Sequence, residues 1–84
     1  MQIIDVRQSL EFMFGHAKGA ISMPLSKLSS DFEKVTKDLD KNSKVVVYCI
    51  SGHRAGIATD LFIKNDYKKV ENGINQRHVE LNYL

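Results

Sequence analysis

Residues Val45 to Phe62 read VVVYCISGHRAGIATDLF, and this stretch decides the fold. The apolar, β-branched run predicts a buried strand from Lys44 to Cys49, and the residues from about Arg54 to Lys64 have a helical pattern. A strand therefore delivers the thiol of Cys49 into a short polar loop, and the loop leads directly into a helix. The first N–H groups of that helix lack helical partners, and the helix dipole adds partial positive charge there. This arrangement favours an anion, either a thiolate or a bound oxyanion.

The rest of the chain alternates strands and helices in the same way. We expect further strands at 2–6, at 20–23 and around Val70. We expect a helix at 10–14, capped by Ser9 and closed by Gly15. The apolar spacing from Leu25 to Leu39 predicts one short turn or helix and then a longer helix from about Ser30, and a last helix is expected at about 75–83. Turns are predicted at 40–43 and at Asn72-Gly73. The pattern predicts an α/β fold with a central, mostly parallel sheet and helices on both faces.

Composition limits the function without identifying it. The chain has 84 residues, enough for one domain, residues 1–84, with one core. Its net charge of +2 is too small to indicate nucleic acid or a membrane surface as the partner. No apolar stretch approaches the ~20 residues of a membrane span, and the apolar start ends at Asp5, too early for a signal peptide. We therefore expect a cytoplasmic protein, or a periplasmic one if a leader has been removed.

Cys49 is the only cysteine of the chain. A single cysteine excludes an intrachain disulfide framework and a metal site made of several thiolates, so we expect neither a metal nor a cofactor. A free cysteine at a strand end is more often an inert core residue. The Gly52, His53 and Arg54 that follow favour a functional interpretation instead.

Four blocks of sequence resemble a known family. They are Asp5-Val6-Arg7, Glu11-Phe12, the segment 15–20 with Met23-Pro24-Leu25, and Cys49-x-x-Gly52-x-Arg54. In this order, over nearly the whole chain, they are similar to single-domain rhodaneses, and among these to small thiosulfate sulfurtransferases of the phage-shock-protein-E type. The resemblance implies a rhodanese-like fold and a sulfurtransferase. Its catalytic residue Cys49 would take sulfane sulfur from a donor such as thiosulfate and carry it as a persulfide to a thiol or cyanide acceptor. A protein persulfide is a further candidate partner.

The chain departs from the family pattern in two places. Family members usually have an additional segment before the Asp-Val-Arg strand, which leaves a trimmed N-terminus open. Near the C-terminus the family often shows Gly-Gly-Ile and, three residues later, a tryptophan. This chain has Asn72-Gly73-Ile74 and then Arg77. The departure weakens the match of the last helix and leaves the cysteine loop unchanged.

The chemistry of the loop can also be argued from its residues. The thiolate is the nucleophile, and at an ordinary pKa of about 8.5 only a few per cent of a cysteine is ionised near neutral pH. Lowering the pKa by about two units requires ~2.7 kcal/mol of preferential anion stabilisation. We expect Gly52 to let the loop curl with its N–H groups inward, and Arg54 to add charge and tie loop carbonyls together. The predicted anion-binding loop comprises Ile50, Ser51, Gly52, His53 and Arg54.

The roles of the other polar side chains stay open at this stage. His53 either adds positive charge at the mouth of the loop or is simply exposed. Ser51 either donates to the sulfur or bonds only the backbone. His16 is predicted to pack and hydrogen-bond rather than to act as a catalytic base. Asp5 and Arg7 lie at the end of a predicted parallel strand, and we expect them to support the loop wall through charge-assisted hydrogen bonds.

Two alternatives remain. Phosphatases of related fold use a Cys-x5-Arg loop around the oxygens of a phosphate, whereas only four residues separate Cys49 from Arg54. The shorter loop predicts a tighter cradle, suited to one sulfur atom, which disfavours a phosphatase or arsenate reductase. The second alternative is an inactive rhodanese-like module that binds a protein partner. Such modules typically lose the cysteine, so its presence here favours activity.

Overall fold

All four strands of the sheet run parallel, in the order β2-β1-β3-β4. The computed structural model describes residues 1–84. Its strands are β1 (Gln2–Asp5), β2 (Ile21–Ser22), β3 (Val45–Cys49) and β4 (Val70–Asn75). Its helices are α1 (Ser9–Phe14), α2 (Leu25–Ser30), α3 (Phe32–Val35), α4 (His53–Lys64) and α5 (Gln76–Asn82). The predicted α/β fold with a parallel sheet is confirmed.

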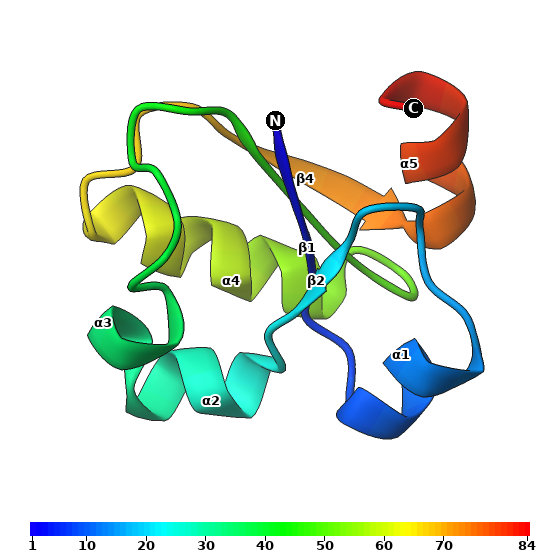
Figure 1. Ribbon diagram of the computed structural model, residues 1–84, viewed down its shortest axis with the longest axis horizontal. Helices are drawn as coiled ribbons and strands as arrows, with labels where there is room; N and C mark the ends of the chain where they lie inside the picture. The colour runs from blue at the N-terminus through cyan, green and yellow to red at the C-terminus, as the bar shows by residue number, and fades with distance from the viewer.

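Strand β3 is buried along its whole length because helices cover both faces of the sheet (Figure 1). Side chains of a strand alternate between the two faces. Val45, Val47 and Cys49 accordingly join a core cluster of 11 buried residues, on the face of α2 and α4. Val46 and Tyr48 join a cluster of 5 buried residues on the opposite face, which also contains Val79 of α5. The helices on both faces that the sequence predicts are thus present.

The segment between β2 and β3 differs from its prediction. The short turn or helix expected first is present as α2, but the longer helix expected from about Ser30 is only the four-residue α3. The two helices are separated at Asp31, whose φ of −153° and ψ of 60° lie outside the helical region. Because the chain turns there, the ring of Phe32 packs edge-on against Phe62 of α4, with ring centroids 5.0 Å apart. Helix α3 ends at Val35, before Leu39, the last residue of the apolar helical spacing.

The predicted turn at Asn72-Gly73 is wrong, because β4 continues through these residues to Asn75. The register with β3 shifts here: Val47 pairs with Asn72, whereas the next residue, Tyr48, pairs with Ile74. Gly73 is the extra residue of a β-bulge. A Cβ atom on this buried glycine would lie only 2.7 Å from Val79 and 2.8 Å from Val46. Close approach of α5 to the sheet thus requires glycine at this position.

Two local expectations also change. Helix α1 begins at Ser9, with Gln8 as its N-cap, because the carboxylate of Glu11 reaches back to accept a hydrogen bond from the Gln8 N–H at 2.9 Å. The last helix begins one residue later than expected, and Asn75 caps it by accepting from the N–H of His78. None of the helices has the length and apolar character needed to cross a bilayer.

Candidate active site

Cys49 is the last residue of β3, and its side chain is only 2% exposed. The next residues form a short loop that ends at Gly52, the N-cap of α4. Gly52 has a φ of 93°, in the left-handed region that favours glycine. This conformation aims the Gly52 N–H at the sulfur of Cys49, 3.1 Å away, and the Ala55 N–H lies 3.4 Å from the same sulfur. The chain therefore surrounds the thiol with backbone donors, as an anion requires.

Two opposing effects set the pKa of Cys49. Burial of the thiol raises its pKa, and this is the largest single contribution. The backbone N–H groups of Ala55, Gly52, Ser51 and Arg54 each lower it, and together they outweigh burial. The pKa of Cys49 is consequently below its ordinary value, and a larger fraction of thiolate is present near neutral pH.

The guanidinium of Arg54 does not tie the loop carbonyls together, as the sequence predicts, but binds a carboxylate of α1. Its Nη1 donates to Oε1 of Glu11 at 3.0 Å, and its Nη2 lies 3.4 Å from Oε2. Glu11 raises the pKa of Arg54, and Arg54 in turn lowers the pKa of Glu11. The difference arises because α1 lies beyond the carboxyl edge of the sheet, within reach of the start of α4 (Figure 1). Arg54 therefore links α1 to the cysteine loop.

Asp5 and Arg7 form a buried network beside the loop. The Asp5 carboxylate, fully buried, accepts from Nε and Nη2 of Arg7 and from the hydroxyl of Tyr48 at 2.7 Å. Arg7 also donates to the carbonyl of Gly15 at 2.7 Å, and the N–H of Ala17 donates to the Tyr48 hydroxyl. Tyr48 directly precedes Cys49, so this network holds the end of β3 against β1 and the 15–17 segment.

The remaining predicted loop residues are exposed. Ile50 is 58% exposed, and Ser51 and His53 are also at the surface. No side-chain hydrogen bond joins Ser51 or His53 to the sulfur, which accepts from the backbone N–H groups of Gly52 and Ala55. His16 stacks on Phe12, with ring centroids 3.7 Å apart, and its Nδ1 lies 2.8 Å from the Phe12 carbonyl. These contacts match the packing and hydrogen-bonding role predicted for His16.

Sequence reasoning assigned no role to three residues that contact the loop or its support. Tyr48 was counted only as part of an apolar strand, and Glu11 only as part of a motif. Asn72 donates from Nδ2 to the carbonyl of Gly52 at 3.0 Å, although it is distant in sequence. Its replacement of a glycine in the family pattern is the one signal that pointed to it.

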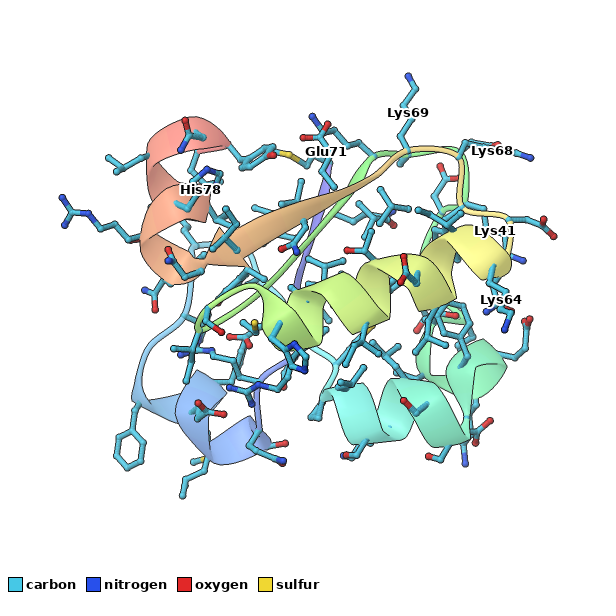
Figure 2. The ribbon with its side chains drawn as sticks, turned by 180° about the vertical axis from the view of Figure 1, so that it is seen from behind. Lys41, Lys64, Lys68, Lys69, Glu71 and His78 are labelled. Carbon is cyan, nitrogen blue, oxygen red and sulfur yellow. The ribbon has the colours of Figure 1, made fainter.

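Positive charge is distributed unevenly over the molecule. Lys41, Lys64, Lys68 and Lys69 gather at one end (Figure 2). Three of them lie in the loops that precede β3 and β4, which places them at the opposite end of the strands from Cys49. Two open hollows of about 370 and 480 Å³ are likewise lined by other parts of the surface, on α4 and along α2 and α3. Neither these four lysines nor the two hollows belong to the cysteine loop.

A sequence profile of the rhodanese-like domain matches residues 1–76. The chain belongs to the rhodanese family, as its sequence resemblance implied. The thiosulfate sulfurtransferase PspE of Escherichia coli strain K12 is 36% identical over 69 residues, which cover 82% of this chain and 64% of that protein. The chain spans 37% and 64% of the length of two curated relatives.

Solved structures agree with this assignment. A rhodanese with anions from Escherichia coli superposes with a TM-score of 0.78 at 32% identity, covering 92% of this chain and 88% of that one. A human single-domain sulfurtransferase superposes with a TM-score of 0.76 at 22% identity, covering 99% and 83%. At that lower identity the human protein supports the fold alone.

Proposed function

We propose that the protein is a sulfurtransferase that carries sulfane sulfur on Cys49 and accepts it from a donor such as thiosulfate. The observation that carries this proposal is the convergence of the Gly52 and Ala55 N–H groups on one buried sulfur, at 3.1 and 3.4 Å. Similarity to a thiosulfate sulfurtransferase supports the choice of donor. The lowered pKa of Cys49 supports its role as the nucleophile.

The proposed reaction has two transfers of the same sulfur atom. The Cys49 thiolate attacks the outer sulfur of thiosulfate, the S–S bond of the donor breaks, and sulfite leaves with the electron pair. Cys49 then bears a persulfide. A thiol or cyanide attacks the outer sulfur, and the Cys49 thiolate is released with its electron pair, so no external oxidant or reductant is needed. With cyanide as the acceptor, the product is thiocyanate.

The loop residues have different proposed roles in this reaction. The N–H groups of the loop and of the first turn of α4 hold the anionic sulfur, first as thiolate and then as the outer atom of the persulfide. Arg54 contributes positive potential from the side, held in place by Glu11. Asp5 and Arg7 support the loop wall through Tyr48. Ile50, Ser51 and His53 line the exposed mouth, where the donor and acceptor arrive.

The size of the loop favours sulfur over phosphate as the transferred group. Four residues separate Cys49 from Arg54, and the guanidinium of Arg54 binds Glu11 rather than facing the sulfur as a free anion ligand. Stabilising a transferring phosphoryl group requires donors around several oxygens at once. The native chain is therefore expected to hydrolyse aryl phosphates negligibly.

Intact mass spectrometry tests the proposal directly. Incubation with thiosulfate should add one sulfur atom, about 32 Da, to the protein, and cyanide should remove it as thiocyanate. Cys49→Ser should stay folded and gain no mass, because a hydroxyl at this position is not ionised. His16→Ala serves as a matched control that leaves the cysteine intact. Sulfur transfer by Cys49→Ser, or turnover of p-nitrophenyl phosphate by a native chain that takes up no sulfur, would contradict the proposal.

A further inference from the structure

Strand β4 contacts the cysteine loop through a single polar side chain. Nδ2 of Asn72 donates to the carbonyl of Gly52 at 3.0 Å. The same carbonyl accepts the N–H of Gly56 at 2.9 Å, as the first helical bond of α4. Gly52 is the residue whose own N–H points at the Cys49 sulfur. Asn72 therefore holds the carbonyl of Gly52, while the N–H of the same residue points at the nucleophile.

Both ends of the Asn72 amide are hydrogen-bonded. While its Nδ2 binds Gly52, its Oδ1 accepts the N–H of Ile74 at 2.9 Å. Both polar ends of the side chain are thus engaged, one on the loop and one on β4 itself. Because its Oδ1 is already bound to β4, the Asn72 side chain loses little further entropy when its Nδ2 binds Gly52. The side chain thus fixes the distance between β4 and the Gly52 carbonyl.

The backbone of β4 is shaped to make this contact. Ile74 has a φ of 70°, which is rare for a β-branched residue, and it follows the bulge at Gly73. Its side chain packs against Gly52: a Cβ atom placed on that glycine would lie 3.5 Å from Cγ2 of Ile74. An unfavourable backbone conformation persists only where its surroundings hold it, and such positions gather at functional sites.

We propose that Asn72 is a positioning residue that fastens the Cys49 loop to β4, so that the Gly52 N–H stays directed at the sulfur. Asn72 does not touch the reacting atoms, and it acts through Gly52. The consequence for sulfur transfer rests on the proposed function, whereas the effect on the thiol does not. Without Asn72, the loop retains its sequence but loses the only side-chain hydrogen bond from outside that holds its Gly52 carbonyl.

The test compares Asn72→Ala with Asn82→Ala. Asn82 is also exposed and donates from Nδ2 to a backbone carbonyl, that of His78 at 2.9 Å, but it lies on α5 away from the loop. Alkylation of Cys49 by iodoacetamide is followed against pH, and sulfur loading from thiosulfate is followed by intact mass. Asn72→Ala should shift the alkylation midpoint to higher pH and slow loading near neutral pH about two- to tenfold, the range of one hydrogen bond. Asn82→Ala should match the native protein in both.

A second variant separates the two hydrogen bonds of Asn72. Asn72→Asp keeps an acceptor for the Ile74 N–H but loses the donor to Gly52. It also replaces Asn72→Ala in the experiment if the alanine variant does not fold. Its shift of the alkylation midpoint should persist in about 1 M salt, where the effect of the added charge is screened. A native profile for Asn72→Ala, or a shift in Asn72→Asp that salt abolishes, would overturn the assignment.

The alkylation measurement keeps the two proposals apart. It needs no sulfur donor, so it reports on the loop whether or not the protein transfers sulfur. A native protein that never gains sulfur contradicts the proposed function, yet a shifted alkylation profile in Asn72→Ala would still support the positioning role. Normal sulfur loading by the native protein and by Asn72→Ala alike, with unchanged profiles, contradicts the positioning role alone.

Discussion

The two faces of the sheet divide the requirements of the site between them. We call the face with the larger core cluster the larger face; there Cys49 lies among 11 buried core residues and contacts the first turn of α4. On the smaller face, Tyr48 lies among only 5 and is held by the buried carboxylate of Asp5. The residues are adjacent in sequence, but the alternation of β3 sends their side chains in opposite directions. One face presents the nucleophile, and the other fastens the strand that carries it.

This division shows why the smaller face needs polar interactions. A cluster of five residues supplies little apolar burial, and the first residues beyond β1 and β3 must still be held in register. Asp5, Arg7 and Tyr48 supply directional contacts there, and burial makes these contacts costly to leave incomplete. We therefore expect substitutions on the smaller face to act on stability, and those near the thiol on the larger face to act mainly on chemistry.

The largest expected effect is on the smaller face. Asp5→Ala should lower the free energy of unfolding by about 3–5 kcal/mol, because it leaves the guanidinium of Arg7 and the hydroxyl of Tyr48 without their partner. Urea unfolding measures the change. Asp38→Ala, at an exposed position, is the control and should stay within about 0.5 kcal/mol of the native protein. Equal stability of the two variants would remove the basis of the comparison.

A steric test of the same face comes second. Gly73→Ala should cost about 1–3 kcal/mol, since the new methyl group would overlap Val79 and Val46 between α5 and the sheet. Gly56→Ala in α4 would place its new Cβ atom 3.6 Å from Nδ2 of Asn72, an ordinary contact, and should be neutral or slightly stabilising because alanine favours helix. Thermal unfolding of both variants measures the contrast. Similar losses at the two glycines would mean that packing of α5 is not tight.

The third prediction concerns the larger face, where the charge of Cys49 should make the free energy of unfolding depend on pH. The folded pKa of Cys49 is below its unfolded value, so the thiolate stabilises the fold fully above the unfolded pKa of about 8.5. This contribution is lost as the pH falls through the folded pKa. Each pKa unit of difference corresponds to about 1.4 kcal/mol. Denaturant unfolding between neutral pH and pH 9 should therefore show rising stability that Cys49→Ala lacks, and equal slopes in the two proteins would contradict it.

The smallest expected effect on stability is at Arg54. Its ion pair with Glu11 is about 30% exposed on both sides, so Arg54→Ala should cost less than about 1 kcal/mol. The pKa of Cys49 should nevertheless rise, because a nearby fixed cation is lost. Lys44→Ala breaks a comparable exposed ion pair with Glu71 and should leave Cys49 unchanged. Alkylation rates against pH distinguish the two, and identical profiles would show that backbone N–H groups alone set the pKa.

The sequence predicted the parts of the fold whose cause is local. A β-branched run, a glycine and a helical pattern follow one another in residues 45–62, and each element lies where that order predicts. The early end of the second helix was missed: α3 stops at Val35 although the apolar spacing continues to Leu39, and its Phe32 packs on Phe62, far away in sequence. The extension of β4 through Asn72-Gly73 was missed because pairing with β3 overrides a composition typical of turns.

For the site too, the sequence predicted what is local and missed the contacts between distant residues. The loop from Cys49 to Arg54 is contiguous, so its residue types indicate its chemistry directly. Its supports are not contiguous: Glu11 meets Arg54 across 43 residues, and Asn72 meets Gly52 across 20. Nothing in the local sequence of either partner indicates the other. The expected carbonyl ties of Arg54 were wrong for this reason, since the guanidinium found a carboxylate that only the folded chain brings close.

The position of β1 inside the sheet has a consequence for how the chain acquires its structure. The strand is made first, yet its long partner is β3, and the Asp5–Tyr48 contact closes 43 residues. A parallel sheet contains no hairpin that could form early, and closing such loops before contacts reward them makes folding slow. During synthesis the edge of β1 that pairs with β3 stays unpaired until β3 has left the ribosome. The Asp5–Tyr48 contact, which holds the site in the folded protein, therefore forms late and cannot start folding.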